Sequence, residues 1–247
     1  MSLHLYADLA EWWPLLSPQD YAGEAPLYLS ILGQALGRRP TSLLELGSGG
    51  GHLALHMPPD LDLVLLDLSP QMLEASQRLN PARTHVRADM RDADLSRCFD
   101  AVLLQDAVMY LLEPEDLLAA CRTAARHLAP GGAFMVLPDV VEEDFVEGHV
   151  AGGAGPSWGE EPGRAARMLE WHWDPVPGDG RYQIDMTFLL RQVDGTVRCV
   201  HDVHTMALRS RGAVWAAIRA AGLQPVEAPP HLAARAGEVF LARKPAG

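Results

Sequence analysis

The sequence predicts an α/β fold in which helices cover both faces of a mainly parallel sheet, and three observations support this prediction. Short apolar runs typical of buried strands alternate with helical segments from residue 41 to 138. A glycine-rich turn, 47–51, follows the first run. Four residues suited to ligand binding stand at the carboxyl ends of runs, where such sheets bind ligands: Gly47, Asp67, Asp89 and Gln105.

The spacing of apolar residues, and the residues typical of helix starts and ends, predict each helix and strand of this region. Strands are expected over 42–46, 62–67, 84–87, 99–104 and 133–137. Helices are expected over 27–36, 51–57, 70–79 and 114–127. Gly37 is the expected stop of the first helix, because glycine adopts the left-handed conformation that ends helices.

The pattern changes after residue 138. Residues 139–163 are rich in Glu, Gly and Pro and predict a loop or a partly ordered helix. Three strands with Asp-Gly turns between them are expected next, as an antiparallel insertion over the mouth of the site: 168–174, 182–192 and 197–206. A helix over 211–221, a strand over 224–227, a long link over 229–237 and a last strand over 238–243 complete the expected core.

The first 26 residues hold an unusual number of aromatic side chains: Tyr6, Trp12, Trp13 and Tyr21. Prolines interrupt the segment, so at most short helical pieces are expected there. Two interpretations stay open. The segment either covers the edge of the sheet or forms a lid over a bound ligand, because exposed tryptophan pairs are costly unless they cover something.

Composition excludes several classes of function. The 247-residue chain carries a net charge of −12, which would repel nucleic acid and anionic membranes. It contains no apolar stretch long enough to span a bilayer. Three distant cysteines, Cys98, Cys121 and Cys199, argue against a disulfide framework or a cysteine-rich zinc site, and we expect them to be buried in a cytoplasmic protein. His201 and His204 should point to opposite faces of a strand, so no metal site is expected.

The glycine-rich turn is the centre of the predicted site. Its sequence, Glu45-Leu46-Gly47-Ser48-Gly49-Gly50-Gly51, differs from the Gly-x-Gly-x-x-Gly of dinucleotide sites. Asp67, at the end of the next strand, is suited to accept hydrogen bonds from two ribose hydroxyls, and its alternative is a cap of the helix after Ser69. Met72 is either a contact of an adenine ring or a core methionine.

In order and spacing, these motifs resemble the class I S-adenosylmethionine-dependent methyltransferases over about the first 140 residues. The resemblance implies a Rossmann-like sheet with an antiparallel final strand and S-adenosylmethionine as cofactor. It implies that Asp89 and Met90 meet the adenine, that Gln105 meets the amino-acid part, and that Glu45 orients the loop and reaches the ammonium group. The implied cofactor-binding set is Tyr21, Glu45, Gly47, Ser48, Gly49, Gly51, Asp67, Leu68, Met72, Asp89, Met90 and Gln105.

Four further segments resemble the small-molecule N-methyltransferases that dimethylate nucleotide-linked amino sugars: Gln19-Asp20-Tyr21, Met90-Arg91-Asp92, Glu143-Asp144-Phe145 and His201-Asp202-Val203-His204. This resemblance implies that Tyr6 and Tyr110 flank the acceptor amine and that His204 lines the pocket. The change of pattern after residue 138 and the return of core elements near 207 divide a single domain, 1–247, into an N-terminal lid (1–26), a cofactor-binding core (27–138 and 207–247) and an inserted lid (139–206).

Several alternatives stay open. The acceptor could instead take the methyl group on oxygen or carbon. Outside methyl transfer, a nicotinamide oxidoreductase remains an alternative, although the glycine spacing argues against it, and so does a nucleoside-binding module without turnover. The residues Gln105-Asp106-Ala107-Val108 replace the Asn/Asp-Pro-Pro-aromatic motif, which disfavours planar amines as acceptors. The expected partner is a small molecule, and an exposed N-terminal segment could mediate a homodimer.

Overall fold

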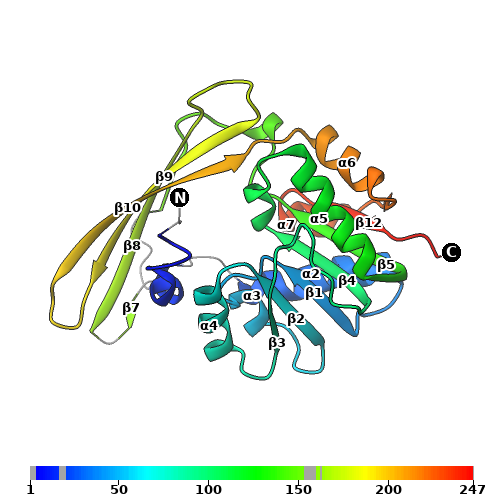
Figure 1. The fold of residues 1–247 in the computed structure, drawn as a ribbon, viewed down its shortest axis with the longest axis horizontal. Helices are drawn as coiled ribbons and strands as arrows, with labels where there is room; N and C mark the ends of the chain where they lie inside the picture. The colour runs from blue at the N-terminus through cyan, green and yellow to red at the C-terminus, as the bar shows by residue number, and fades with distance from the viewer. Residues whose placement is uncertain (1–3, 17–20, 153–159, 162, 247) are drawn as a thin grey trace.

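The computed structural model describes residues 4–16, 21–152, 160–161 and 163–246, arranged around two β-sheets (Figure 1). The core sheet has seven strands and the order β11-β12-β5-β4-β1-β2-β3. A second, antiparallel sheet stands apart from it, and we call it the lid sheet. Motif residues Gln19 and Asp20, and parts of both predicted lids, lie outside the described residues.

The core sheet confirms the predicted α/β fold. Its parallel strands are β1 (Ser42–Leu46), β2 (Asp62–Asp67), β3 (Thr84–Arg87), β4 (Phe99–Gln105) and β5 (Leu128–Leu137). β12 (Phe240–Arg243) runs antiparallel to β5, and β11 (Gln224–Pro225) completes the edge. The strand order reverses between β1 and β4, so their carboxyl ends form the switch point where ligands of such sheets bind.

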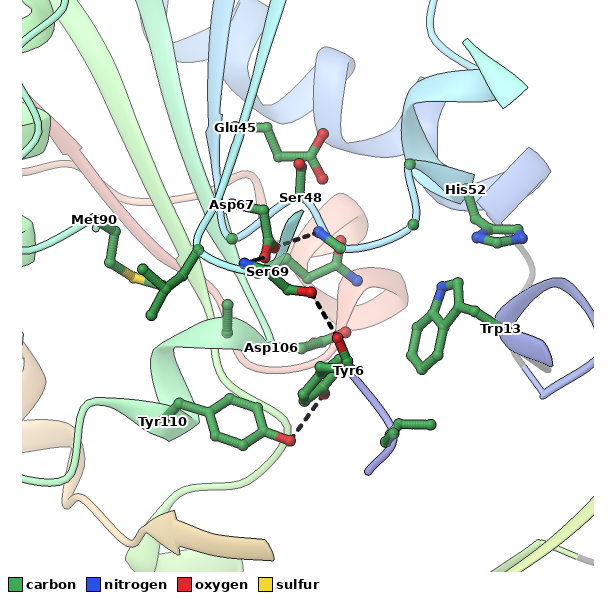
Figure 2. A pocket seen from close by; sticks show the side chains of 18 of the residues that line it. Tyr6, Trp13, Glu45, Ser48, His52, Asp67, Ser69, Met90, Asp106 and Tyr110 are labelled. Atoms are coloured by element: carbon green, nitrogen blue, oxygen red, sulfur yellow. Dashed lines mark hydrogen bonds between the residues drawn. The ribbon is translucent and has the colours of Figure 1, made fainter. Parts of the chain in front are cut away.

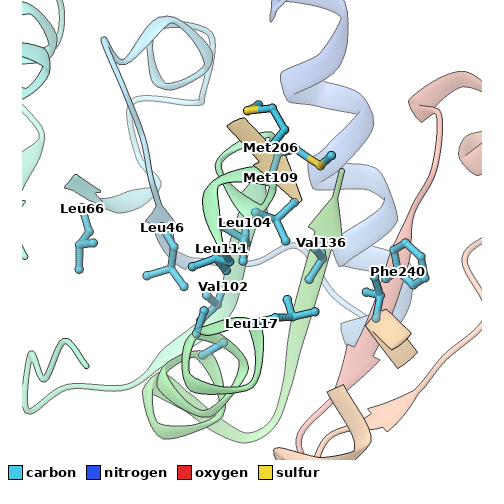
Figure 3. Close-up of a cluster of buried hydrophobic side chains, with 14 of the residues drawn as sticks. Leu46, Leu66, Val102, Leu104, Met109, Leu111, Leu117, Val136, Met206 and Phe240 are labelled. Atoms are coloured by element: carbon cyan, nitrogen blue, oxygen red, sulfur yellow. The ribbon is translucent and has the colours of Figure 1, made fainter. Parts of the chain in front are cut away.

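Side chains alternate between the two faces of the core sheet and build two apolar layers. On one face, Leu44 and Leu46 pack with α5 (Pro114–His127) and α6 (Arg211–Ala220), and Figure 3 shows this cluster around Val102, Leu104 and Leu117. On the other face, Leu43 packs with α2 (Tyr21–Leu36), α3 (His52–Leu55) and α7 (Pro230–Ala236). The helix α4 (Pro70–Leu79) begins at Ser69, whose hydroxyl accepts the Met72 N–H.

Several expected boundaries were wrong, and β5 begins at Leu128 rather than 133. Helix α2 begins at Tyr21 rather than 27, with Pro26 inside it. Proline removes one donor and one helical bond near the helix start, and the burial of Tyr28, Ile31 and Leu32 offsets that loss. The expected link over 229–237 contains α7, because proline at the first helical position is already in helical conformation and Leu232 packs in the core.

The lid sheet contains the three expected strands and two short additional ones. β8 (Arg164–Trp173), β9 (Arg181–Arg191) and β10 (Val197–Ala207) pair in antiparallel register. β6 (Val150–Gly152) and β7 (Glu160–Glu161) both pair with β8. The segment expected as loop or helix therefore supplies strand edges as well as the short helix η3 (Glu142–Asp144), since β8 offers unpaired backbone groups on that side.

The N-terminal segment lies between the lid sheet and the core (Figure 1). Its short helices η1 (Ala10–Trp12) and α1 (Trp13–Leu16) contact α4 on one side and β8 on the other. Two hydrogen bonds anchor it, since the Leu5 N–H donates to Asp202 (2.8 Å) and the Ser69 hydroxyl donates to the Tyr6 carbonyl (2.6 Å). The segment thus joins the two sheets.

Two further expectations concern cysteines and membranes. Cys121 is buried as expected, but Cys98 and Cys199 are exposed, because Cys98 precedes β4 in a loop and Cys199 is on the outer face of β10. No helix among the described residues has both the length and the apolar character that crossing a membrane requires.

Gly51 should tolerate a side chain less well than Gly37, although both have a left-handed backbone conformation. Its φ is +76°, and a Cβ there would lie 2.2 Å from Ser76 Oγ and 2.6 Å from Asn80 Nδ2. We expect Gly51→Ala to lower the free energy of unfolding by about 3 kcal/mol, from left-handed strain and steric overlap together. Chemical denaturation measures this value.

Gly37→Ala is the matched control, because Gly37 has φ +71° and nothing within 4 Å of a Cβ. It should lose only about 1 kcal/mol. Equal losses in the two variants would contradict the steric argument.

Candidate active site

A cavity of about 870 Å³ opens at the carboxyl ends of β1, β2 and β4. The glycine-rich turn forms one wall, the N-terminal segment covers it, and the inner face of the lid sheet closes the far side. Figure 2 shows Glu45, Ser48 and Asp67 on the core wall, with Tyr6 and Tyr110 opposite. This volume lies in the range of small-molecule and cofactor sites.

The glycine-rich turn presents backbone to the cavity because side chains do not fit behind it. A Cβ at Gly47 would lie 2.3 Å from the Ala107 Cβ, and one at Gly50 would lie 2.3 Å from Trp13 Cδ1. Gly49, by contrast, has only the Met72 methyl at 3.9 Å. The wall is therefore a cradle of backbone held between the short helix η2 (Ala107–Tyr110) and the N-terminal segment.

Asp67 holds this turn in place. Its Oδ2 accepts the Gly49 N–H and its Oδ1 accepts the Ser69 N–H, both at 2.8 Å. Burial raises the pKa of the Asp67 carboxyl, and the hydrogen bonds from Ser69 and Gly49 oppose that rise. Asp67 therefore both stabilises the start of α4, as its capping interpretation predicts, and lines the cavity, as its ligand-binding interpretation predicts.

Three buried polar atoms around the cavity have no hydrogen-bond partner: Glu45 Oε2, Ser48 Oγ and His52 Nδ1. Burial, with the charge of Asp67 second, raises the pKa of Glu45 to about 8. Burial, with His56 second, lowers the pKa of His52 to about 4. Unsatisfied groups of this kind are rare in folded proteins, so the wall is complementary to a polar ligand that carries a cation.

Tyr6 and Tyr110 lie together in the cavity, and their hydroxyls are 2.8 Å apart. The Tyr110 hydroxyl is 2.6 Å from Nδ1 of His204. His204 itself is fully buried and does not line the cavity, so its expected position in the pocket was wrong. It stands behind Tyr110, because the alternation along β10 directs it inward beneath η2.

The other predicted residues divide into two groups. Most of the predicted cofactor-binding set lines the cavity: Tyr21, Glu45, Gly47, Ser48, Gly49, Gly51, Asp67, Leu68, Asp89, Met90 and Gln105. Met72 is fully buried behind Gly49 and does not line it, which is the core-methionine alternative. Asp89 forms an ion pair with Arg91 at 2.6 Å, which lowers the pKa of its carboxyl.

Sequence reasoning missed an acidic group that lines the cavity: Asp106 just after β4, Asp139 shortly after β5, and Glu170 on β8. Solvent reaches Asp139 through the cavity, yet the surrounding protein desolvates it and raises its pKa, while a hydrogen bond with Asp106 opposes the rise. Asp106 also has an unusual φ of +41°. The alternation along β8 places Glu170 and His172 on one face of the strand, but the local sequence does not show that this face covers the core sheet.

Trp13 and His52 were also missed as lining residues, although the aromatic N-terminal segment was a clear signal. Their rings lie 6.3 Å apart, and the His52 ring lies 6.0 Å from that of Tyr21 (Figure 2 shows the first pair). Because Trp13 packs against Gly50, the segment covers the cavity, as the lid interpretation predicts.

The two histidines of β10 lie on opposite faces of the strand, as expected. The described part of the chain holds no group of three or more His, Cys, Asp or Glu side chains able to bind an ion. His201 is exposed on the outer face of β10 and bonds Asp185 at 2.8 Å, on the face opposite to His204.

The comparisons with known proteins agree with this site. Residues 43–132 match a family model described as a methyltransferase domain. The chain is 31% identical over 223 residues to the Streptomyces venezuelae dTDP-3-amino-3,4,6-trideoxy-alpha-D-glucopyranose N,N-dimethyltransferase, covering 89% of this chain and 90% of the relative. The crystal structure of Streptomyces venezuelae DesVI is 28% identical, with a TM-score of 0.82 over 97% of this chain and 98% of that one.

A second solved structure, the sugar N-methyltransferase KedS8 from Streptoalloteichus, is 27% identical with a TM-score of 0.81, over 99% of this chain and 94% of that one. Fold and site together define a class I S-adenosylmethionine-dependent methyltransferase. Within that class, the chain belongs to the family of small-molecule methyltransferases that includes the Streptomyces venezuelae relative. It is an enzyme that uses S-adenosylmethionine as methyl donor, which excludes the oxidoreductase and binding-module alternatives.

The residues present fit this cofactor. The unpartnered Glu45 oxygen is complementary to an ammonium group, and Gly49 leaves the turn open, because the nearest atom to a Cβ there would be the Met72 methyl at 3.9 Å. Asp67 retains lone pairs for hydroxyl donors beside the two backbone bonds it accepts.

Glu45→Gln should separate stability from cofactor binding. The folded-state pKa of about 8 lies above the ordinary value of 4.5 for Glu, so the folded protein loses stability as pH rises from about 4.5 through about 8 and has lost most of this contribution at pH 9. The variant avoids this loss, and we expect its midpoint of thermal unfolding at pH 9 to exceed that of the parent by about 3 °C. Its affinity for S-adenosylhomocysteine should fall about tenfold, because a neutral amide replaces the partner of an ammonium group.

Glu74→Gln, at an exposed position of α4, is the matched control and should change neither value. Calorimetry at pH 7 in two buffers of different ionisation enthalpy should also detect a proton released by the parent on binding. Binding without proton release, and with unchanged affinity in Glu45→Gln, would contradict this role of Glu45.

Proposed function

We propose that this methyltransferase transfers methyl groups to the amine of a nucleotide-linked amino sugar. The observation that supports the acceptor is the acidic group Asp106, Asp139 and Glu170, which lines the same cavity as Tyr6 and Tyr110. Carboxylates in a partly desolvated cavity attract an ammonium ion much more strongly than a neutral hydroxyl. The relatives at 31% and 28% identity are named as N,N-dimethyltransferases of dTDP-linked amino sugars, which agrees with this chemistry.

In this proposal, each wall has a separate role. The backbone of Gly47–Gly51, with Glu45 and Asp67, holds the cofactor, and Asp89, Met90 and Gln105 complete its binding site. Bound S-adenosylmethionine supplies a methyl group on a positively charged sulfur. Tyr6 and Tyr110 position the acceptor nitrogen, and Trp13 excludes water over the turn.

We further propose a single domain over 1–247 with the N-terminal and inserted lids described above, and a cytoplasmic location. The net charge of −12 disfavours nucleic acid and membranes as partners. Exposed apolar side chains on the outer face of the lid sheet, Leu169, Trp171 and Leu189, favour a homodimer, which light scattering would test.

The direct test is turnover. Incubated with S-adenosylmethionine and a dTDP-linked 3-amino-deoxy sugar, the purified enzyme should add one and then two methyl groups, detected by mass spectrometry. The same dTDP sugar with a hydroxyl in place of the amine is the control and should remain unmodified. Methylation of the hydroxyl sugar, or of neither, would overturn the amine assignment.

The acidic group can be tested separately. Asp139→Asn should raise the KM for the amino sugar at least about tenfold, because an amide replaces a carboxylate that faces an ammonium ion. Its affinity for S-adenosylhomocysteine should stay within about twofold of the parent. Glu227→Gln, an exposed change outside the cavity lining, controls for net charge. An unchanged KM in Asp139→Asn would remove Asp139 from the acceptor site.

A further inference from the structure

A continuous chain of hydrogen bonds leads from the cavity to a buried carboxylate. The Tyr6 hydroxyl lies 2.8 Å from that of Tyr110, which lies 2.6 Å from His204 Nδ1. On the other side of the ring, His204 Nε2 lies 3.0 Å from Asp202 Oδ2. Tyr6 and Tyr110 line the cavity, whereas His204 is completely buried and Asp202 is 6% exposed. The chain therefore has one end at the substrate and one end closed off from solvent.

The direction of every hydrogen bond in this chain follows from its buried end. A carboxylate only accepts, and Asp202 Oδ2 also accepts the Leu5 N–H at 2.8 Å. His204 must therefore carry its proton on Nε2, which leaves Nδ1 as an acceptor for Tyr110. The Tyr110 oxygen then accepts from Tyr6. Both lone pairs of the Tyr6 oxygen remain available to a donor in the cavity.

We propose that His204 and Asp202 are positioning residues of a proton relay that removes the acceptor's proton through Tyr110 and Tyr6. This inference rests on the proposed function, because the relay removes a proton from an acceptor amine that enters the cavity as an ammonium ion. It adds Asp202 to the machinery and gives His204 a role that involves no contact with the substrate.

The proton balance of the step is complete. One N–H bond of an acceptor ammonium breaks and its proton joins the Tyr6 oxygen. Tyr6 passes its own proton to Tyr110, and Tyr110 passes its own to His204 Nδ1. The amine keeps the electron pair and becomes a nucleophile, and each tyrosine ends neutral. The positive charge has moved to an imidazolium beside the Asp202 carboxylate.

The surrounding charges fit a relay better than a single base. Burial raises the pKa of both tyrosines, and Asp139 adds to this rise, so neither forms a stable phenolate that could act alone. Burial lowers the pKa of His204, which keeps the imidazole neutral and ready to accept a proton. The charged groups that face His204 are Asp202 on its own strand and Glu170 on β8, and both favour the imidazolium.

The chain contains a matched control on the opposite face of the same strand. His201 Nε2 lies 2.8 Å from Asp185 Oδ1, so it forms the same His–carboxylate pair outside the cavity. Asp185→Asn therefore controls for Asp202→Asn, and His201→Gln controls for His204→Gln.

The first measurement is the pH dependence of kcat with the amino sugar. Activity should fall at low pH as His204 becomes protonated. Asp202→Asn should lower kcat about tenfold and move this acidic limb to lower pH, because the imidazolium loses its partner. Tyr110→Phe and His204→Gln should lower kcat and remove the limb, with KM for S-adenosylmethionine within about twofold of the parent. The two control variants should retain the parent profile. A merely structural role would lower kcat without moving the limb, and that result would overturn the proposal.

A second measurement needs no turnover. In protein labelled with 15N-histidine, the His204 resonances should show a protonated Nε2 and an acceptor Nδ1, and Asp202→Asn should change this pattern while Asp185→Asn should not. A His204 protonated on Nδ1 in the parent would refute the relay whatever the acceptor. The expected tautomer combined with no methylation of any amino sugar would instead count against the proposed function alone.

Discussion

The Asp67 carboxylate is the interaction on which the site depends. It joins three elements of the core. It stands at the end of β2, holds the glycine-rich turn through the Gly49 N–H, and supports the start of α4 through the Ser69 N–H. Ser69 in turn donates to the Tyr6 carbonyl. One buried acid thus sets the position of the cofactor cradle and, through one further hydrogen bond, of the segment that covers it. Without it, the backbone N–H of Gly49 would face the cavity unpaired.

Acidic side chains line the cavity in two groups, and burial is the main cause that raises pKa values in each. Glu45 and Asp67 are close enough to interact at the cradle, and Asp139 interacts with Asp106 and Glu170. In the free protein this arrangement is unfavourable, because each carboxyl group must either keep its proton or carry its charge in a desolvated space. Cationic groups beside these acids would relieve the cost. The burial that makes ionisation costly in the empty enzyme therefore also gives it selectivity for positively charged ligands.

Much of the core could be predicted because its signals are local. Apolar runs marked β1, β2 and β3 at their observed bounds, and Gly37 follows the end of α2 in the left-handed conformation as expected. The wrong predictions concern segments whose structure depends on tertiary contacts, which the local sequence does not show. Burial of Tyr28 and Ile31 extends α2 through Pro26, and pairing with β8 orders β6. The same distinction holds for the residues that line the cavity. The glycine-rich turn is contiguous in sequence and could be predicted, whereas Asp139, Glu170 and Trp13 line one cavity only through the tertiary fold. His204 could be named as a functional candidate from its residue type. Only the position of η2 in the fold shows that Tyr110 stands between His204 and the cavity.

The N-terminal segment has a consequence for the timing of turnover. Tyr6 belongs to the same short stretch as Trp13, which packs against the glycine-rich turn, and Leu5 is tied to Asp202. Any movement that lifts this stretch away from the cradle also withdraws the Tyr6 hydroxyl and breaks the bond to the lid sheet. Ligand exchange and chemistry would then require different conformations, so the enzyme would alternate between a state that admits molecules and a state that reacts. The N-terminal segment would thereby keep a reactive cofactor from meeting an acceptor before both are enclosed.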